Sequence, residues 1–137
     1  MAMTHDERKQ FLGKTRLGIL TTIDERGDPT AVPVWYEWDG LVVRFFSFAS
    51  APKVARLRRR PRASLLVVND VDEPEAWVAF DGDVAISNDG VIALAERLAA
   101  RYWDLNDPAR VKELTSWRNM ASRFCLLTLN PRRIRTS

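Results

Sequence analysis

The sequence of 137 residues contains a single cysteine and no long apolar run. One cysteine, Cys125, excludes an internal disulfide and suits a reducing compartment, so we expect a cytoplasmic protein. No apolar stretch approaches the roughly 20 residues that span a bilayer. The first residues also lack the apolar segment of a signal peptide, so we expect no membrane partner.

The scarcity of histidine and cysteine also limits the chemistry. The one histidine, His5, lies near the N-terminus, and the apolar neighbours of Cys125 predict a buried, inert thiol. No spaced Cys/His set is present, so we expect no metal site and no nucleophilic triad. Neither a G-x-G-x-x-G nor a Walker loop occurs. The catalytic residues stay unknown, and an enzyme here would need to borrow a reactive cofactor.

The length and patterning predict a single β-rich domain over residues 1–137. Alternating apolar residues between turn signals predict antiparallel strands, and a bend is expected at Gly82. The expected strands cover residues 17–23, 30–38, 41–48, 63–68, 76–87 and 123–130, with helices near 6–14, 52–60, 91–102 and 108–117. Such strands favour a closed or nearly closed barrel, because closure removes exposed edges.

A basic segment, residues 50–62, is the most informative part of the chain. Six of the ten residues from Lys53 to Arg62 are cationic. Pro52 suits the first turn of a short helix, with Ser50 as its N-cap, and Pro61 ends it. Free N–H groups at a helix start, with cations beside them, form a site for a phosphate.

The same segment suggests roles for individual side chains. Lys53 would contact the phosphate directly, with help from the hydroxyl of Ser47 or Ser50. Arg56 lies one helical turn further on and shares the face of Lys53, whereas Arg58 and Arg59 would either join the site or be solvated. These residues together predict a phosphorylated small ligand at the end of a sheet.

Two other interpretations of the basic helix stay open. It would be purely structural if it formed a solvated face beside the acidic loop, residues 69–75. It would bind nucleic acid if aromatic residues were interleaved with the cations or if the helix could read a groove. Crowded cations on a short helix and a net charge of +3 do not fit the second interpretation, so we expect no nucleic acid partner.

The flat rings of the tryptophans could pack in a core, at an interface or against a planar ligand. Trp35 and Trp38 lie on opposite faces of one predicted strand, so one is expected in the core and the other exposed, at an interface or facing a ligand. Trp77 begins the strand after the acidic loop and would stack on a planar cofactor or pack in a dimer. Trp103 and Trp117 lie on predicted helices and suit a core or an interface.

Several segments, in this order, resemble a known family. The chain is similar to the pyridoxamine 5'-phosphate oxidase-like split β-barrel proteins, and most of all to the actinobacterial flavin/deazaflavin oxidoreductases that use coenzyme F420. The lysine–arginine helix that ends in Arg-Pro-Arg is the most specific element. The matching segments are residues 17–22, 27–29, 32–36, 39–40, 53–62, 77–78 and 130–135.

This resemblance implies a mainly β fold, a six-stranded antiparallel split β-barrel with flanking helices. It also implies a homodimer with two cofactors in the grooves between the subunits. The strand that contains Val32, Pro33, Val34 and Trp35 would line the ring system of the cofactor, largely through its backbone. The turn and helix start from Ser47 to Lys53 would hold the phosphate. Arginines that match Arg56 and its neighbours would face the acidic tail of the deazaflavin.

The sequence departs from the family pattern at the helix start. Pro52 removes one N–H donor to the phosphate, and a single Lys53 replaces the Arg-Lys pair of the flavin-using oxidases. The second difference favours F420 over FMN.

We therefore expect an enzyme that transfers a hydride from reduced F420 to an electron-poor small organic acceptor, with solvent or Tyr36 as the proton source. The alternatives are an FMN-dependent oxidoreductase and a non-catalytic protein that binds F420, flavin or haem.

Overall fold

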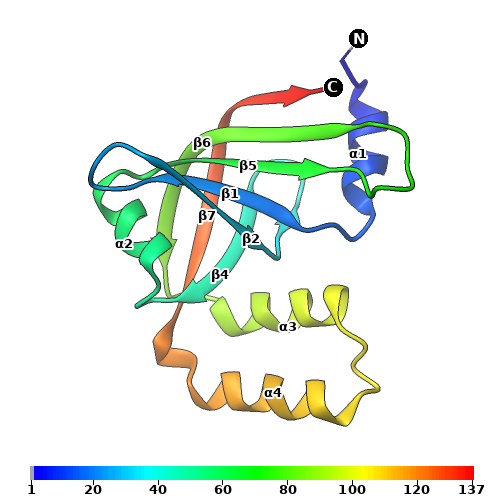
Figure 1. Cartoon of the computed structure of the whole chain (residues 1–137). Helices are drawn as coiled ribbons and strands as arrows, with labels where there is room; N and C mark the ends of the chain where they lie inside the picture. The colour runs from blue at the N-terminus through cyan, green and yellow to red at the C-terminus, as the bar shows by residue number, and fades with distance from the viewer. Residues whose placement is uncertain (1) are drawn as a thin grey trace.

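The computed structural model describes residues 2–137, in which seven strands form one antiparallel sheet (Figure 1). The strands are β1 (Gly18–Ile23), β2 (Pro29–Val34), β3 (Glu37–Trp38), β4 (Val43–Phe48), β5 (Arg62–Val68), β6 (Trp77–Ser87) and β7 (Phe124–Thr136). The helices are α1 (His5–Gly13), α2 (Pro52–Arg59), α3 (Val91–Tyr102) and α4 (Pro108–Asn119), with a short 3-10 helix, η1 (Ala121–Arg123), before β7.

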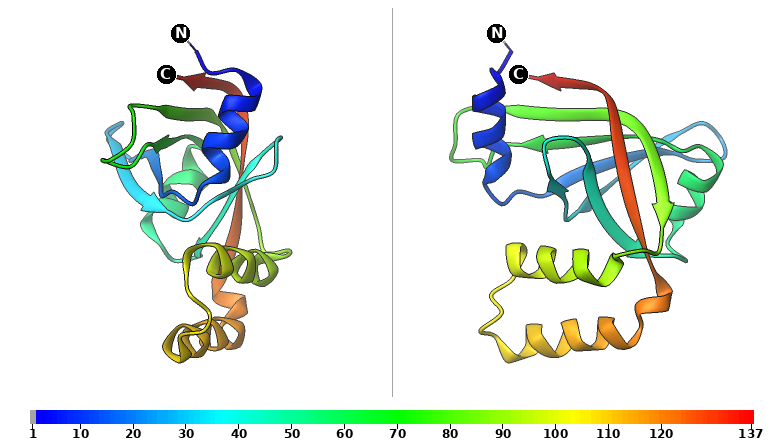
Figure 2. Two further views of the ribbon diagram at one scale, coloured as in Figure 1. Left: turned by 90° about the vertical axis from the view of Figure 1, so that its right-hand side faces the viewer. Right: turned by 180° about the vertical axis from the view of Figure 1, so that it is seen from behind.

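The order of the strands explains the shape of the sheet. The order is β2-β1-β5-β6-β7-β4-β3, so β2 and β3 lie at the two edges. Only Trp35 and Tyr36 separate these two edge strands along the chain. The sheet must therefore curl until its edges lie close together, and Figures 1 and 2 show this curled sheet. The predicted split barrel is confirmed, because the sheet curls while its edge strands, β2 and β3, stay unpaired with each other.

The number of strands is corrected from six to seven. The strand expected at residues 30–38 divides into β2 and β3 at Trp35 and Tyr36. The backbone N–H of Tyr36 donates to the hydroxyl of Tyr102 at 3.3 Å. This N–H is thereby satisfied by a side chain of α3, so the strand ladder can break at this point without leaving a buried donor unpaired.

The expected bend at Gly82 is confirmed as a β-bulge. The register between β6 and β7 shifts between Asp81 and Gly82. A Cβ atom at Gly82 would lie 2.0 Å from the carbonyl oxygen of Asn130, so no larger residue fits. Beyond the bulge, β6 pairs with β7 as far as Thr136, so the last strand expected at residues 123–130 continues through the segment around Ile134.

Two apolar clusters hold the elements together. The larger one fills the barrel, and its fully buried side chains include Leu20, Phe45, Leu65, Phe80 and Leu127. The smaller one joins the predicted apolar face of α3 to the start of β7 through Val91, Leu94, Leu98, Phe124 and Leu126. Figure 2 shows that α3 and α4 form a layer outside the barrel. Within residues 2–137, no helix is both long enough and apolar enough to pass through a membrane.

Candidate functional site

The basic helix α2 begins at Pro52 and ends at Arg59, just before Pro61, as the two prolines predict. The predicted N-cap is wrong: Ala51 caps the helix, not Ser50. A turn closed by the Ala51 N–H and the Phe48 carbonyl oxygen, 3.0 Å apart, starts the helix one residue later. Ala51 has no side-chain acceptor, so no side chain caps the first turn of α2. Pro52 has no N–H, and the N–H of Val54 donates to the carbonyl oxygen of Ala51 at 3.0 Å, so within the described residues only the Lys53 N–H of this turn is left for an external anion.

The side chain of Lys53 lines a cavity of about 260 Å³ beside this helix. The other lining residues come from β2, from the residue after it, from β4 and from the α3–α4 layer. They are Pro33, Val34, Trp35, Phe46, Trp103 and Trp117. We call this the aromatic-walled cavity. The structure thus brings Lys53 together with three of the four predicted residues of the β2 segment.

The aromatic rings of this cavity support one another. The ring of Trp35 stacks on Tyr102 at 5.0 Å and meets the edge of Trp103 at 4.9 Å. Trp103 in turn lies 5.0 Å from Trp117. Trp38 instead packs on Phe80 in the barrel core, so the prediction that Trp35 and Trp38 lie in different environments is confirmed. These contacts fix a set of flat apolar walls around the lysine.

Lys53 is half-buried and lacks a compensating anion. Burial lowers the pKa of its ammonium, and the nearby positive charge of Arg56 lowers it further. The Cys125 thiol acts in the opposite direction. Among residues 2–137 no carboxylate perturbs this lysine. An unpaired ammonium against apolar walls favours the binding of an anionic group.

The arginines of α2 differ in how firmly they are held. The Nε of Arg56 donates to the hydroxyl of Thr22 on β1 at 2.7 Å, which fixes this guanidinium close to Lys53. Arg59 pairs with Glu25 in the β1–β2 turn, and both side chains are largely exposed. Arg58 is exposed, and within the described residues it forms no ion pair. Only Arg56 is therefore fixed by a partly buried hydrogen bond.

The chain matches the family model described as pyridoxamine 5'-phosphate oxidase over residues 4–137. The protein belongs to this family. No curated protein sequence matches it. The family match agrees with the curled sheet and with the position of the basic helix after β4.

Solved structures share the fold of this oxidase family member. An F420 reductase superposes with a TM-score of 0.74 at 24% identity, covering 92% of this chain and 94% of the reductase. A conserved hypothetical protein from Mycobacterium tuberculosis gives a TM-score of 0.78 at 26% identity, with coverages of 99% and 85%. A haem storage protein from Vibrio cholerae gives 0.70 at 18% identity, with coverages of 95% and 92%.

Seven predicted residues of this family member do not line the aromatic-walled cavity: the three arginines of α2 described above, and Val32, Ser47, Ser50 and Trp77. Val32 packs against the barrel core, and Ser47 is buried opposite Cys125 of β7. Ser50 lies in a separate hollow beside Arg123. Trp77 begins β6 next to the acidic loop and contacts the guanidinium of Arg135 at 5.9 Å. The contributions of these seven residues to cofactor binding stay predictions.

Tyr36 does not reach the cavity either. Its side chain is fully buried in the barrel core, whereas the neighbouring Trp35 points to the α3–α4 layer. Burial raises the pKa of Tyr36 to about 12. Its hydroxyl has no hydrogen-bond partner within residues 2–137. Tyr36 is therefore a poor choice as the proton source.

The sequence interpretation missed three lining residues, Phe46, Trp103 and Trp117. The two tryptophans were assigned only to a core or an interface. The available signal was the alternation along β4, which places Phe46 and Phe48 on the face opposite Phe45. The contact of Phe46 with Trp117, at 5.5 Å, joins segments about seventy residues apart and cannot be read from local patterns.

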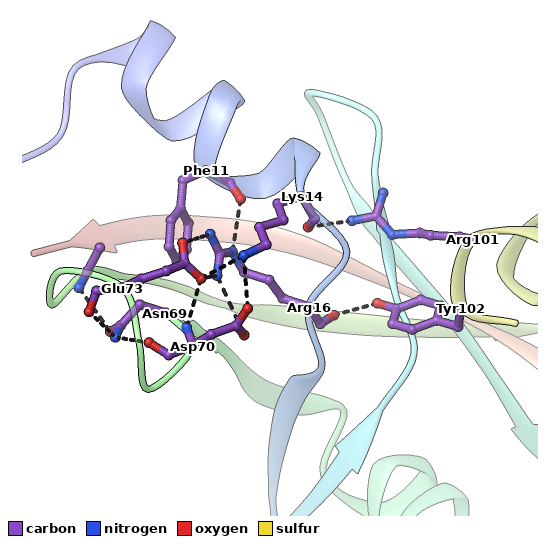
Figure 3. Close-up of polar contacts among 9 residues, drawn as sticks. Phe11, Lys14, Arg16, Asn69, Asp70, Glu73, Arg101 and Tyr102 are labelled. Atoms are coloured by element: carbon purple, nitrogen blue, oxygen red, sulfur yellow. Dashed lines mark hydrogen bonds and ion pairs between the residues drawn. The ribbon is translucent and has the colours of Figure 1, made fainter.

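The acidic loop lies at the other end of the barrel from α2 (Figure 1). Its Glu73 accepts two hydrogen bonds from the buried Arg16, at 2.7 and 2.9 Å, and one from Lys14 at 3.0 Å (Figure 3). Lys14 also pairs with Asp70 at 2.9 Å. The basic helix therefore does not lie beside the acidic loop, as the structural interpretation expected, and the carboxylates of Asp70 and Glu73 pair with Lys14 and Arg16 instead. A solvated, structural role of the helix is not tested by this placement.

Proposed function

We propose that the protein is an F420-dependent oxidoreductase that transfers a hydride from reduced deazaflavin to an electron-poor small organic acceptor. The observation that carries this proposal is the half-buried Lys53, which lines an aromatic-walled cavity and has no anionic partner among the described residues. A ligand with a planar ring and an acidic group suits both properties. The fold shared with an F420 reductase supports the same choice.

The residues present fit this cofactor. Lys53 would hold an acidic group, assisted by the uncapped first turn of α2. The backbone of β2 at Pro33 and Val34, with the ring of Trp35, would orient the planar portion. Arg56 and Arg58 would attract the acidic tail that FMN lacks. When bound, the deazaflavin supplies a two-electron hydride carrier that reacts poorly with oxygen.

The chain's own residues would act mainly by placement. Trp35, Trp103 and Trp117 would exclude water and restrict the orientation of an acceptor beside the ring. Such positioning contributes several kcal/mol to the rate of a reaction between two bound partners. The lining side chains include no carboxylic acid, histidine or thiol, so the final proton would come from solvent.

We further propose that the working form is a homodimer. The cavity of about 260 Å³ is smaller than the roughly 300–1,000 Å³ typical of small-molecule sites. A second subunit packed over the aromatic-walled cavity would complete the site and would supply its remaining walls. Trp77, which lies away from the cavity of its own chain, would be available to that partner.

A second candidate is a non-catalytic protein that binds the cofactor. The absence of an acid among the lining residues favours it. Haem is the less suitable ligand for this role, because the one histidine, His5, lies on α1 and lines a different cavity.

Equilibrium binding of F420 and FMN, measured side by side with absorbance spectra, tests the proposal. We expect tighter binding of F420, followed by loss of reduced F420 when a quinone such as menadione is added. Tighter binding of FMN would select the flavin alternative. Binding of F420 without hydride transfer to quinones or activated alkenes would select the non-catalytic protein. Failure to bind either cofactor would overturn the proposal.

A further inference from the structure

A second cavity, of about 390 Å³, lies between α1, the β3–β4 hairpin and the last turn of α3. We call it the α1 cavity. It shares no lining residue with the aromatic-walled cavity. Figure 1 places α1 at the opposite end of the barrel from α2, so this cavity is separate from the proposed cofactor site.

The face of α1 that lines this cavity carries nitrogen-bearing side chains. His5, Arg8 and Lys9 follow helical spacing and all line the cavity. Arg8 is held by a contact of its Nη2 with Nδ1 of His5 at 3.3 Å. The acidic Glu7 points elsewhere, because it completes the capping box with Thr4 and lines another hollow beside Lys14. Of the charged residues of α1, Arg8 and Lys9 therefore line the α1 cavity, whereas Glu7 lies on another face.

Arg101 adds a further cation from α3, and this side chain is held in place. Its Nη2 donates to the carbonyl oxygens of Leu12 and Lys14, each at 3.1 Å, and Figure 3 shows the side chain reaching toward the end of α1. These bonds also offset the partial negative charge of that helix end. Its Nε is buried without a hydrogen-bond partner in the described chain. Among the described residues, Arg101 forms no ion pair with a carboxylate.

One carboxylate, Asp39, lines the same cavity, but its charge is compensated. It accepts hydrogen bonds from the backbone N–H groups of Val42 and Leu41 and from Nη1 of Arg44. These donors lower the pKa of Asp39 to about 2. Asp39 therefore does not neutralise Arg8, Lys9 and Arg101.

Trp38 supplies an apolar wall. Its ring packs on Phe80 of the barrel core at 4.7 Å, which fixes its orientation, and the half-buried side chain also lines the cavity. A flat ring beside cations is suited to a ligand that is itself flat and negatively charged. The volume of the α1 cavity lies within the roughly 300–1,000 Å³ typical of small-molecule sites.

We propose that the α1 cavity binds a small planar organic anion, an aromatic carboxylate. Its carboxylate contacts Arg8, Lys9 and Arg101, and its ring lies against Trp38. This site is additional to the proposed cofactor site and does not depend on F420. It binds without any covalent step.

The test uses 2-naphthoate as the probe and two-dimensional NMR spectra of the full-length protein. We expect saturable shifts of the Trp38 indole N–H and of the Gly13 and Gly40 amides, which line the cavity. Arg8→Gln combined with Lys9→Gln should weaken binding about tenfold, as expected for the loss of charge-assisted contacts. The control, Lys112→Gln with Arg118→Gln, removes two exposed charges from α4 and should leave binding unchanged.

A neutral analogue, 2-naphthylmethanol, separates charge from stacking. We expect it to cause much smaller shifts at the same positions. The proposal is overturned if 2-naphthoate causes no saturable shift at Trp38, or if its shifts gather at Trp35, Trp103 and Trp117 instead. Equal affinity for the neutral analogue, or an unchanged affinity in a folded α1 double variant, would also overturn it.

Discussion

Trp35 and Tyr102 stack with their ring planes within 1° of parallel, and this pair joins the aromatic-walled cavity to the barrel. The hydroxyl of Tyr102 donates to the carbonyl oxygen of Arg16 at 2.6 Å (Figure 3). The same hydroxyl accepts the N–H of Tyr36. The ring of Tyr102 therefore packs against a wall of the cavity, and its hydroxyl satisfies the backbone N–H at the break between β2 and β3.

Tyr102→Phe separates these two roles. The variant keeps the stacked ring but leaves the carbonyl of Arg16 and the N–H of Tyr36 without this partner. We expect a loss of about 1–3 kcal/mol in the free energy of unfolding, the cost of an unsatisfied buried group. Cofactor affinity should stay unchanged. Urea unfolding and equilibrium binding measure the two effects, and unchanged stability in the variant would contradict the role of the hydroxyl.

Lys53→Met should affect binding and stability in opposite directions. We expect cofactor binding to weaken by about 1.5–3 kcal/mol, the range for hydrogen bonds to charged groups. The apo protein should become slightly more stable, because the lowered pKa of Lys53 means that folding disfavours its charge. Below that pKa the penalty is fully present, and it disappears as the pH rises toward 10.5.

Titration calorimetry and urea unfolding at several pH values measure both effects of Lys53→Met. Lys112→Met, on the exposed face of α4, serves as the matched control and should change neither quantity. An unchanged dissociation constant in Lys53→Met would mean that the basic helix is only a solvated surface.

Replacing Arg58 and Arg59 by glutamine should distinguish the two cofactors. Both side chains are exposed, so each contact with an acidic tail contributes about 0.2–1 kcal/mol. We expect F420 affinity to fall and FMN affinity to stay nearly constant, because FMN lacks the tail. Parallel titrations at low salt measure the difference. Equal losses for both cofactors would remove the assignment of these arginines to the tail.

Glu73→Gln should lower the free energy of unfolding at neutral pH and make that free energy less dependent on pH in acid. Hydrogen bonds from Arg16 and Lys14 hold the pKa of Glu73 well below its usual range. The unfolded chain therefore binds more protons below about pH 4.5, and the stabilisation present at neutral pH is lost as the pH falls through that range. The variant lacks this contribution and also leaves Arg16, which is 6% exposed, without its main partner.

Urea unfolding between pH 3 and pH 7 measures this effect as a shift of the midpoint. We expect Glu73→Gln to lower the midpoint at neutral pH and to flatten its fall in acid. Glu113→Gln, which removes an exposed pair with Arg110 at 3.9 Å, should behave like the unchanged protein. A steep acid transition that persists unchanged in Glu73→Gln would rule out a contribution from this carboxylate.

Local sequence signals predict most of the fold because they depend on neighbouring residues. Pro52 and Pro61 bound α2 and Gly82 marks the bulge, both as expected. The division of β2 from β3 was not predictable in this way. It accompanies a hydrogen bond between Tyr36 and Tyr102, 66 residues apart, and no local pattern encodes such a contact.

The residues of the candidate site were likewise predictable only where they did not depend on contacts between distant segments. Lys53 was identified from charge and from the family resemblance, whereas the β2 segment was identified from the resemblance alone. Trp103 and Trp117 became part of the cavity only through the way the α3–α4 layer folds back on Trp35. The partners of the acidic loop, Lys14 and Arg16, were missed for a similar reason, since they lie more than fifty residues away in sequence.

Trp35 and Tyr36 bridge the open seam of the barrel, and Trp35 is also a wall of the aromatic-walled cavity. A ligand packed against the ring of Trp35 would hinder the separation of the two edge strands, β2 and β3. Occupancy would then slow amide hydrogen exchange at the junction more than at the distant α1. Ligand binding would therefore stabilise the barrel against opening between β2 and β3.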